Sequence, residues 1–100
     1  MNEIQEIAPQ EYEVTVVISN DLGLHARPAA MVAKAAQKYC SDVHFIVSGQ
    51  KADAKSIVDI LSLAASKGTA LKLHGKGADA KNCIEEIANL VRLQFMEESA

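Results

Sequence analysis

The sequence has no tryptophan and only two phenylalanines and two tyrosines among its 100 residues. A buried core must therefore be built mainly from Val, Ile, Leu and Ala. Basic residues do not outnumber acidic ones, and the net charge of −3 argues against a nucleic-acid binder, which normally carries a basic stripe. No stretch approaches the roughly 18 apolar residues of a membrane-spanning helix. A chain of this length and polarity predicts one small domain without membrane insertion.

Cysteine is also scarce. Cys40 and Cys83 stand far apart, without the CxxC spacing of a redox or zinc motif. The first ten residues carry Glu3 and Glu6 and show no cationic region followed by an apolar one, so no secretory signal is expected. Isolated cysteines without such a signal are typical of reduced thiols in the cytoplasm. We expect a cytoplasmic protein in which Cys83 fills the core and Cys40 ends a helix.

Hydrophobic periodicity divides the rest of the chain. Tyr12, Val14, Val16 and Ile18 alternate with polar residues, as in a strand with one buried face. The Ala-rich stretch that begins at Pro28 has helical spacing instead. The patterns predict strands over 12–19, 43–48, 51–53 and 69–77, a helix over 28–39, a short helix over 56–65 with Ile57, Ile60, Leu61 and Ala64 buried, and a last helix capped by Asp79 and continuing to Phe95.

The order β-α-β-β-α-β-α and the tight hairpins predict an α+β fold. We expect an open-faced β-sandwich, in which a four-stranded, mainly antiparallel sheet carries three helices on one face. Residues 1–11 are predicted to be a loose N-terminal tail, 12–96 the folded domain and 97–100 a C-terminal tail.

The segment LGLHARPA, residues 22–29, lies between a predicted strand and a predicted helix. Pro28 lacks an N–H and has a preset φ, so it suits the first turn of a helix. His25 and Arg27 then lie among backbone N–H groups that have no acceptor within the helix. Such a helix start binds anions, and Arg27 presents a planar fork to phosphate oxygens. Gly23 supplies the turn that exposes His25.

The same position suits histidine chemistry. The positive end of a helix disfavours an imidazolium, and a neutral imidazole has a lone pair that can attack phosphorus. The arrangement therefore favours holding and passing on a phosphoryl group. From the residues alone, two alternatives stay open: His25 as a plain cap or surface residue, and a helix start that binds a metabolite or sulfate without chemistry.

The segment 22–29 resembles the signature of the HPr family, the phosphocarriers of the bacterial phosphoenolpyruvate-dependent phosphotransferase system. Residues 55–69, KSIVDILSLAASKGT, resemble that family's second signature, and the resemblance covers residues 12–95. It implies that His25 is phosphorylated on Nδ1, that Arg27 steadies the phosphoryl group, and that Gly23, Ala26 and Pro28 form the supporting turn. The resemblance further implies sugar transport, with enzyme I as donor and enzyme IIA domains as acceptors, for a monomeric carrier that has no turnover of its own. Neither a cofactor nor a metal is expected.

The second signature contains Ser56, which the resemblance places at the site of a regulatory serine kinase. Ser56 also fits as the N-cap of the short helix, with Asp59 completing an S-x-x-D capping box. The family's Gram-positive members typically have Gly where this chain has Asp59, and a carboxylate there would repel a phosphoserine. Ser56 is therefore open to either role.

The resemblance also places partner docking on apolar residues of the first two helices. The candidates are Ala26, Ala30, Ile57, Val58 and Leu61. His44 and His74 have no ligand-like spacing and are expected as solvent-facing strand residues. Two further functions stay open: a regulatory paralogue that acts in nitrogen or carbon control through protein binding, and a non-catalytic α+β module that binds an anion or a metal.

Overall fold

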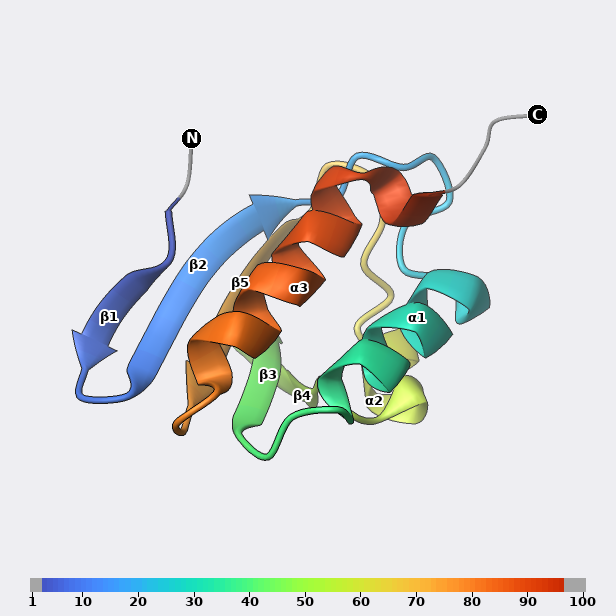
Figure 1. Ribbon diagram of the computed structural model, residues 1–100. Helices are drawn as coiled ribbons and strands as arrows, with labels where there is room; N and C mark the ends of the chain where they lie inside the picture. Colours follow the sequence, from blue (N-terminus) through green and yellow to red (C-terminus); the bar gives the residue numbers. More distant parts are fainter. Residues whose placement is uncertain (1–2, 97–100) are drawn as a thin grey trace.

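The computed structural model describes residues 3–96 of the chain. Five strands form one antiparallel sheet in the order β1-β2-β5-β3-β4 (Figure 1). The strands are β1 Gln5–Ala8, β2 Glu11–Val17, β3 Asp42–Val47, β4 Gln50–Asp53 and β5 Ala70–Lys76. The helices are α1 Ala26–Ala36, α2 Ile57–Ser62 and α3 Ala80–Arg92, followed by the short 3₁₀ helix η1 Gln94–Met96. No helix among the described residues is long and apolar enough to cross a membrane.

The apolar face of the sheet follows from strand register. Val14 lies opposite Leu73, Leu73 opposite Phe45, and Phe45 opposite Ala52, so one row of buried side chains crosses four strands. Because successive strand residues point to opposite faces, the polar residues between them point away from the core. The expected alternation and fold class are confirmed.

The helices cover the apolar face of the sheet. The apolar side of α3 packs against β2 and β5, while α1 packs against both α3 and α2 (Figure 1). The short helix α2 contacts β4. After α3, positive φ angles at Gln94 (54°) and Phe95 (57°) turn the chain so that the Phe95 side chain is fully buried. Phe95 is therefore a core residue, but it lies beyond α3 rather than on it.

The N-terminal strand corrects the expected loose tail. Residues Gln5–Ala8 form β1, which pairs antiparallel with β2 along an edge of the sheet. Gln10 makes the turn with a φ of 58°, and its N–H donates to Glu6 Oε2 at 3.2 Å. A short, polar strand of this kind exists only because β2 offers it partners. The sheet thus has five strands rather than four, and the expected tail at 97–100 lies outside the described residues.

The second helix is also shorter than its pattern predicted. It ends at Ser62, and Ala64 adopts a left-handed conformation with a φ of 49°. Of the four residues expected to be buried, only Ile60 is fully buried, while Ile57, Leu61 and Ala64 are exposed. Within α2 only Ile60 therefore faces the core, and Ile57, Val58 and Leu61 are exposed.

Candidate functional site

His25 immediately precedes α1. Its backbone is extended, with φ −82° and ψ −172°, and its carbonyl accepts the first helical hydrogen bond, from the Ala29 N–H at 3.0 Å. The side chain is half-buried and does not cap the helix. The predicted position of His25 at the start of a helix is therefore observed, although the helix begins at Ala26 rather than at Pro28.

The first turn of α1 offers an environment for an anion. The N–H groups of Ala26 and Arg27 precede the first helical hydrogen bond, and Pro28, which is buried, has no N–H. No acidic residue lies in this turn, so the partial positive charge of the helix end is not offset there. Arg27 is exposed beside it. A negatively charged group approaching this turn would meet two N–H donors and a guanidinium.

The backbone N–H groups of the loop before His25 are held by hydrogen bonds, one within the loop and one to Ala65. Gly23 has a φ of +65°, and its N–H donates to the Asn20 carbonyl at 3.2 Å. The Leu24 N–H donates to the Ala65 carbonyl at 2.9 Å. A Cβ on residue 23 would lie 2.4 Å from that carbonyl oxygen. Glycine is therefore required at this position for two reasons, its backbone conformation and the close approach of the 65–66 backbone.

The two motifs singled out in the sequence lie together. Ile18 donates to the Thr69 carbonyl at 3.0 Å and accepts from the Gly68 N–H at 2.8 Å. An exposed ion pair, Lys67 with Asp21 at 3.0 Å, joins the same two loops. The loop that precedes α1 is thus attached to the segment between α2 and β5. The second signature supports the first, in addition to supplying α2.

The apolar docking candidates are all exposed. Val58 is 76% exposed, Ile57 41% and Leu61 39% on α2, and Ala26 and Ala30 are exposed on α1, which packs beside α2. Leu22, with 71% exposure, was missed by the sequence analysis. The only signal was a large apolar residue inside the turn sequence NDLG, where a polar residue is more usual.

Ser56 is the N-cap of α2. Its Oγ accepts a hydrogen bond from the Asp59 N–H at 3.1 Å. The other half of the predicted capping box is not formed, because the Asp59 carboxylate accepts from the Asp53 N–H at 3.2 Å and the Ser56 N–H donates to the Asp53 carbonyl. The backbone of Asp53 therefore binds both the Ser56 N–H and the Asp59 carboxylate, while the Asp53 carboxylate accepts from the Lys55 N–H at 2.9 Å.

The other two histidines lie on the sheet face opposite the helices. His44 and His74 are cross-strand partners, and His74 Nε2 lies 2.6 Å from Glu11 Oε2. Burial is the main cause that lowers the pKa of His44, and the positive charge of Lys51 lowers it further. Within residues 3–96, no three His, Cys, Asp or Glu side chains are arranged to hold a metal ion. The two histidines are half-buried rather than fully solvent-facing.

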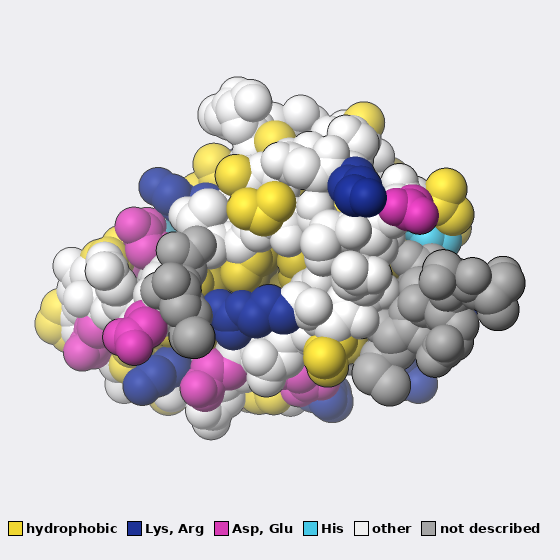
Figure 2. Space-filling model, turned by 90° about the horizontal axis from the view of Figure 1, so that it is seen from above, with side chains coloured by type: hydrophobic (Ala, Val, Ile, Leu, Met, Phe, Trp, Pro, Cys, Tyr) yellow, Lys and Arg dark blue, Asp and Glu magenta, His cyan; other side chains and the backbone are white. Residues whose placement is uncertain are grey.

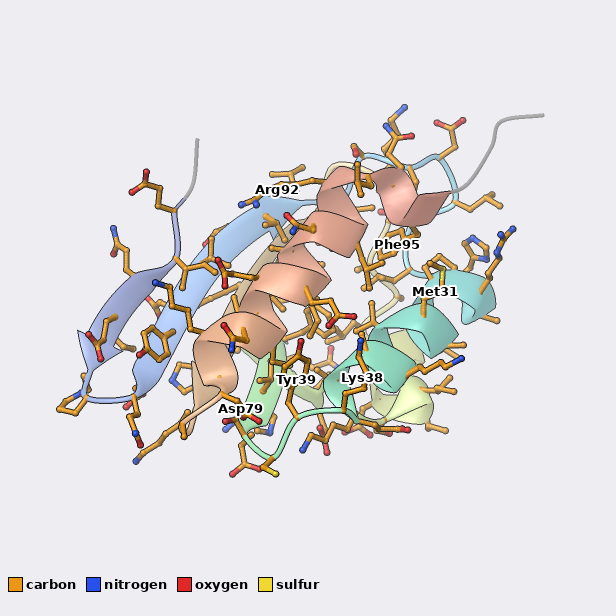
Figure 3. The ribbon with its side chains drawn as sticks, viewed as in Figure 1. Met31, Lys38, Tyr39, Asp79, Arg92 and Phe95 are labelled. Carbon is orange, nitrogen blue, oxygen red and sulfur yellow. The ribbon has the colours of Figure 1, made fainter. Side chains whose placement is uncertain are left out.

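At the other end of α1, charged side chains join the helix to α3 (Figure 3). Tyr39 Oη donates to Glu86 Oε1 and Lys38 Nζ donates to Glu86 Oε2, both at 2.6 Å. The hydrogen bond to Glu86 raises the pKa of Tyr39 to about 12. The hydrogen bond from Lys38, with that from Tyr39, lowers the pKa of Glu86.

A second group of polar side chains lies beside this one. Asp79 occupies the N-cap position of α3, but its carboxylate does not cap that helix. It accepts hydrogen bonds instead from the Ser41 hydroxyl and from the N–H groups of Cys40 and Ser41, each N–H at 3.0 Å. The pKa of Asp79 is lowered, mainly by the hydrogen bond from the Ser41 hydroxyl and further by the bonds from the two N–H groups. The expected capping role of Asp79 is thus replaced by a link to the end of α1.

Both cysteines are free, as expected. Cys83 is buried on α3, and burial raises the pKa of its thiol to about 11. Cys40 is exposed beyond the end of α1. The surface turned toward the reader in Figure 2 mixes acidic and basic side chains, with no broad patch of one sign on its coloured part.

Comparison with known proteins places this geometry in a family. The family model described as the PTS HPr component phosphorylation site matches residues 12–92. The chain is 34% identical over 73 residues to the phosphocarrier protein HPr of Mycoplasma capricolum subsp. capricolum, covering 73% of this chain and 82% of that protein. It is 41% identical over 70 residues to the HPr-like protein Crh of Bacillus subtilis, covering 70% and 82%. The crystal structure of HPr-C-His from Thermoanaerobacter tengcongensis matches with a TM-score of 0.82 and 41% identity, covering 86% and 97%.

Proposed function

Because this chain belongs to the HPr family of phosphocarriers of the phosphotransferase system, we propose that His25 accepts a phosphoryl group from phosphorylated enzyme I and donates it to enzyme IIA domains. The observation that carries the proposal is the position of His25 directly before α1, with the N–H groups of Ala26 and Arg27 beside it.

The transfer uses the Nδ1 lone pair of a neutral His25 imidazole. A bond forms from Nδ1 to phosphorus while the bond between phosphorus and the donor group breaks, and the donor keeps that electron pair. The proton on Nε2 stays on the ring. Donation to an acceptor reverses these steps, so the carrier returns to its starting state. Little covalent chemistry is required of the protein, and catalysis consists of positioning and charge stabilisation.

The surrounding residues stabilise the charge of the phosphoryl group. Arg27 is exposed within the first turn of α1, where its guanidinium can bind two phosphate oxygens. Ala26 contributes an N–H, Pro28 lies in the first turn of α1 and fixes its own φ there, and Gly23 makes the turn before the helix. The site is open, which lets one surface receive the group and pass it on.

The partners dock on the exposed apolar residues around His25. Val58, Ile57 and Leu61 on α2, with Ala26 and Ala30 on α1, form one surface beside the histidine, and Leu22 extends it. An apolar patch that the fold leaves uncovered is typical of an interaction site. Enzyme I and enzyme IIA domains use this surface in turn.

Labelling from phosphoenolpyruvate tests the proposal. In the presence of enzyme I, the wild-type chain should gain an acid-labile, alkali-stable phosphoryl group, and His25→Ala should not. His44→Ala is the matched control, because it removes a half-buried histidine from the opposite face of the sheet and should leave labelling intact. Absence of label on the wild-type chain with an active enzyme I would refute the proposal.

The role of Arg27 has its own comparison. Arg27→Ala should slow transfer about 100- to 1,000-fold, the scale expected when one charge-stabilising group is removed. Arg92→Ala removes the other arginine, in the last turn of α3 and outside the first turn of α1, and should change the rate little. Equal rates in the two variants would exclude a role for Arg27 in transfer.

A second candidate function is regulation through protein binding, favoured by the 41% identity to the HPr-like protein Crh. Under this reading His25 is labelled, but the phosphoryl group passes to enzyme IIA domains too slowly to support transport. Measuring transfer to a panel of enzyme IIA domains separates the two functions.

We further propose that a regulatory serine kinase phosphorylates Ser56. Incubation with an HPr serine kinase and ATP should modify the wild-type chain, and Ser56→Ala should remove the modification. Because the Asp59 N–H donates to the Ser56 hydroxyl, a phosphate on that hydroxyl would be close enough to the negative charge of Asp59 to be repelled, and Asp59→Gly should be modified faster. Modification at an equal rate would show that this repulsion is unimportant.

The carrier is proposed to act as a monomer. One solved relative is described as an HPr dimer from Thermoanaerobacter tengcongensis, at 34% identity and a TM-score of 0.70. Sedimentation equilibrium of this chain over a range of concentrations decides between the two states.

A further inference from the structure

Only two polar residues within 3–96 are buried, Asn20 at 3% exposure and Ser41 at 5%. Ser41 belongs to the hydrogen bonds with Asp79 described above. Asn20 lies in the loop between β2 and α1, five residues before His25 in the sequence. A buried amide in a loop is retained only where its hydrogen bonds offset the cost of burial, so the contacts of Asn20 indicate its purpose.

Asn20 binds both backbone groups of Gly23. Its side-chain Nδ2 donates to the Gly23 carbonyl at 2.9 Å, and its main-chain carbonyl accepts from the Gly23 N–H at 3.2 Å. Gly23 has a left-handed backbone and lies against Ala65. The amide thus closes the turn at the point where the chain bends toward the site.

The constraint continues without interruption to the histidine. After Gly23, the Leu24 N–H is held by the Ala65 carbonyl and the Leu24 side chain is buried. The His25 carbonyl is then held by the Ala29 N–H. Three consecutive residues are therefore fixed by hydrogen bonds, and Asn20 supplies the side-chain amide that fixes the first of them.

We infer that Asn20 is a positioning residue for phosphoryl transfer: its amide fixes the Gly23 carbonyl and thereby the direction in which the His25 ring leaves the start of α1. This inference rests on the carrier function proposed above. In-line attack depends on the angle and distance between Nδ1 and phosphorus, and a small displacement of a reacting group is enough to slow such a step. Asn20 touches neither phosphoryl group nor partner.

The test separates positioning from a loss of folded protein. Asn20→Asp keeps the size of the side chain but replaces the N–H donor with an oxygen that faces the Gly23 carbonyl. Asn20→Ser keeps a polar group that is too short to replace the amide. The matched control is Ser41→Ala, which removes the other buried polar side chain, at the opposite end of α1. All are assayed in the cold, after circular dichroism has shown a folded chain, with enzyme I and phosphoenolpyruvate.

The expected result is a kcat for phosphorylation of the chain that falls about 10- to 100-fold in both Asn20 variants, with KM near the wild-type value. KM is expected to hold because the docking residues are untouched. A variant that is only less stable would instead raise the apparent KM in proportion to the unfolded fraction and leave kcat unchanged. Ser41→Ala is expected to keep the wild-type kcat.

The experiment distinguishes a failure of the Asn20 inference from a failure of the carrier proposal. If the wild-type chain is not phosphorylated, the carrier proposal fails. If it is phosphorylated and both Asn20 variants keep the wild-type kcat, or lose no more of it than Ser41→Ala, Asn20 has no positioning role and the inference is overturned.

Discussion

At its N-terminal end α1 is attached to the rest of the chain mainly by backbone hydrogen bonds, whereas at its C-terminal end it is attached by charged and hydroxyl side chains. The first attachment joins Leu24 to Ala65 and Ile18 to the segment 68–69. The second joins Tyr39 and Lys38 to Glu86, and Ser41 to Asp79. Lys55 Nζ adds a bond to the Tyr39 carbonyl at 2.8 Å.

This difference matches the division of work between the two ends. Side chains at the C-terminal end are used up in holding α1 against α3, and the pKa of Asp79 and of Glu86 is lowered as a result. At the N-terminal end, backbone hydrogen bonds and the buried Asn20 amide hold the loop, together with the exposed Lys67–Asp21 ion pair. Arg27 and Leu22 therefore remain exposed for a partner. If the chain carries phosphoryl groups as proposed, this arrangement suits it, because the contacts that hold the loop do not occupy Arg27 or Leu22.

The largest effect is expected from adding a methyl group to Gly23, whose backbone lies against the Ala65 carbonyl. Gly23→Ala should lower the free energy of unfolding by about 2–4 kcal/mol, because it combines a strained φ with a clash against the Ala65 carbonyl. Gly49→Ala is the control, since Gly49 also has a positive φ but nothing lies within 4 Å of its Cβ position; it should cost only about 1 kcal/mol. Equal costs in urea unfolding would show that the contact between the two loops does not hold the N-terminal end.

A smaller and pH-dependent effect is expected at the other end. The folded-state pKa of Asp79 is lowered from its ordinary value of 3.8, so the contribution of this carboxylate to stability is present above about pH 3.8 and is lost as the pH falls through the folded value. Asp79→Asn should therefore lower the urea midpoint at neutral pH, by less than Gly23→Ala, and the gap to wild type should close in acid.

Asp42→Asn gives the matched control for that measurement. Asp42 is an exposed acid one residue from Ser41, and its replacement should move the midpoint little at either pH. A gap between wild type and Asp79→Asn that stays constant down to acid pH would contradict the assigned role of the Asp79 carboxylate.

How far the sequence predicts the fold depends on whether a residue's type reflects its environment. Alternation at Val14 and Val16 identifies β2 because buried strand positions select apolar residues. The strand β1 has no such pattern: three of its four residues are exposed, and it is held by pairing with β2. The left-handed conformation of Ala64 cannot be predicted from its residue type either, because alanine normally continues a helix.

The candidate site shows the same contrast. His25, Arg27 and Pro28 are recognisable because their chemistry requires those residue types at that spacing. The hydrogen bond from the Leu24 N–H to the Ala65 carbonyl cannot be recognised in the sequence, because almost any residue supplies a backbone N–H and C=O. The support of the site is therefore less visible in the sequence than the site itself, and Gly23 and Asn20 are the supporting residues whose types give a clue.

A modest gain in stability is expected at Ala64. This residue follows the Leu63 C-cap of α2 with a φ of 49°, a position that glycine usually occupies. Ala64→Gly should raise the free energy of unfolding by about 0.5–1 kcal/mol, because it relieves the left-handed strain. Ala30→Gly, within α1, is the control and should lower stability by a similar amount. A loss of stability in Ala64→Gly would show that the Ala64 methyl group has a packing role that outweighs its strain.

The smallest effect on stability, and the sharpest spectroscopic one, is expected at Glu86. The hydrogen bond to Glu86 raises the pKa of Tyr39 to about 12, so the bond's contribution is complete below about pH 10 and is lost as the pH rises toward 12. In a Tyr12→Phe background, where Tyr39 is the only tyrosine left, Glu86→Gln should move the absorbance titration of Tyr39 down toward 10. Stability at neutral pH should fall by less than about 1 kcal/mol, because the pair is partly exposed. Rapid pH jumps record the titration before the chain unfolds. A Tyr39 titration that does not move in Glu86→Gln would mean that burial, rather than the side-chain contact with α3, governs this end of α1.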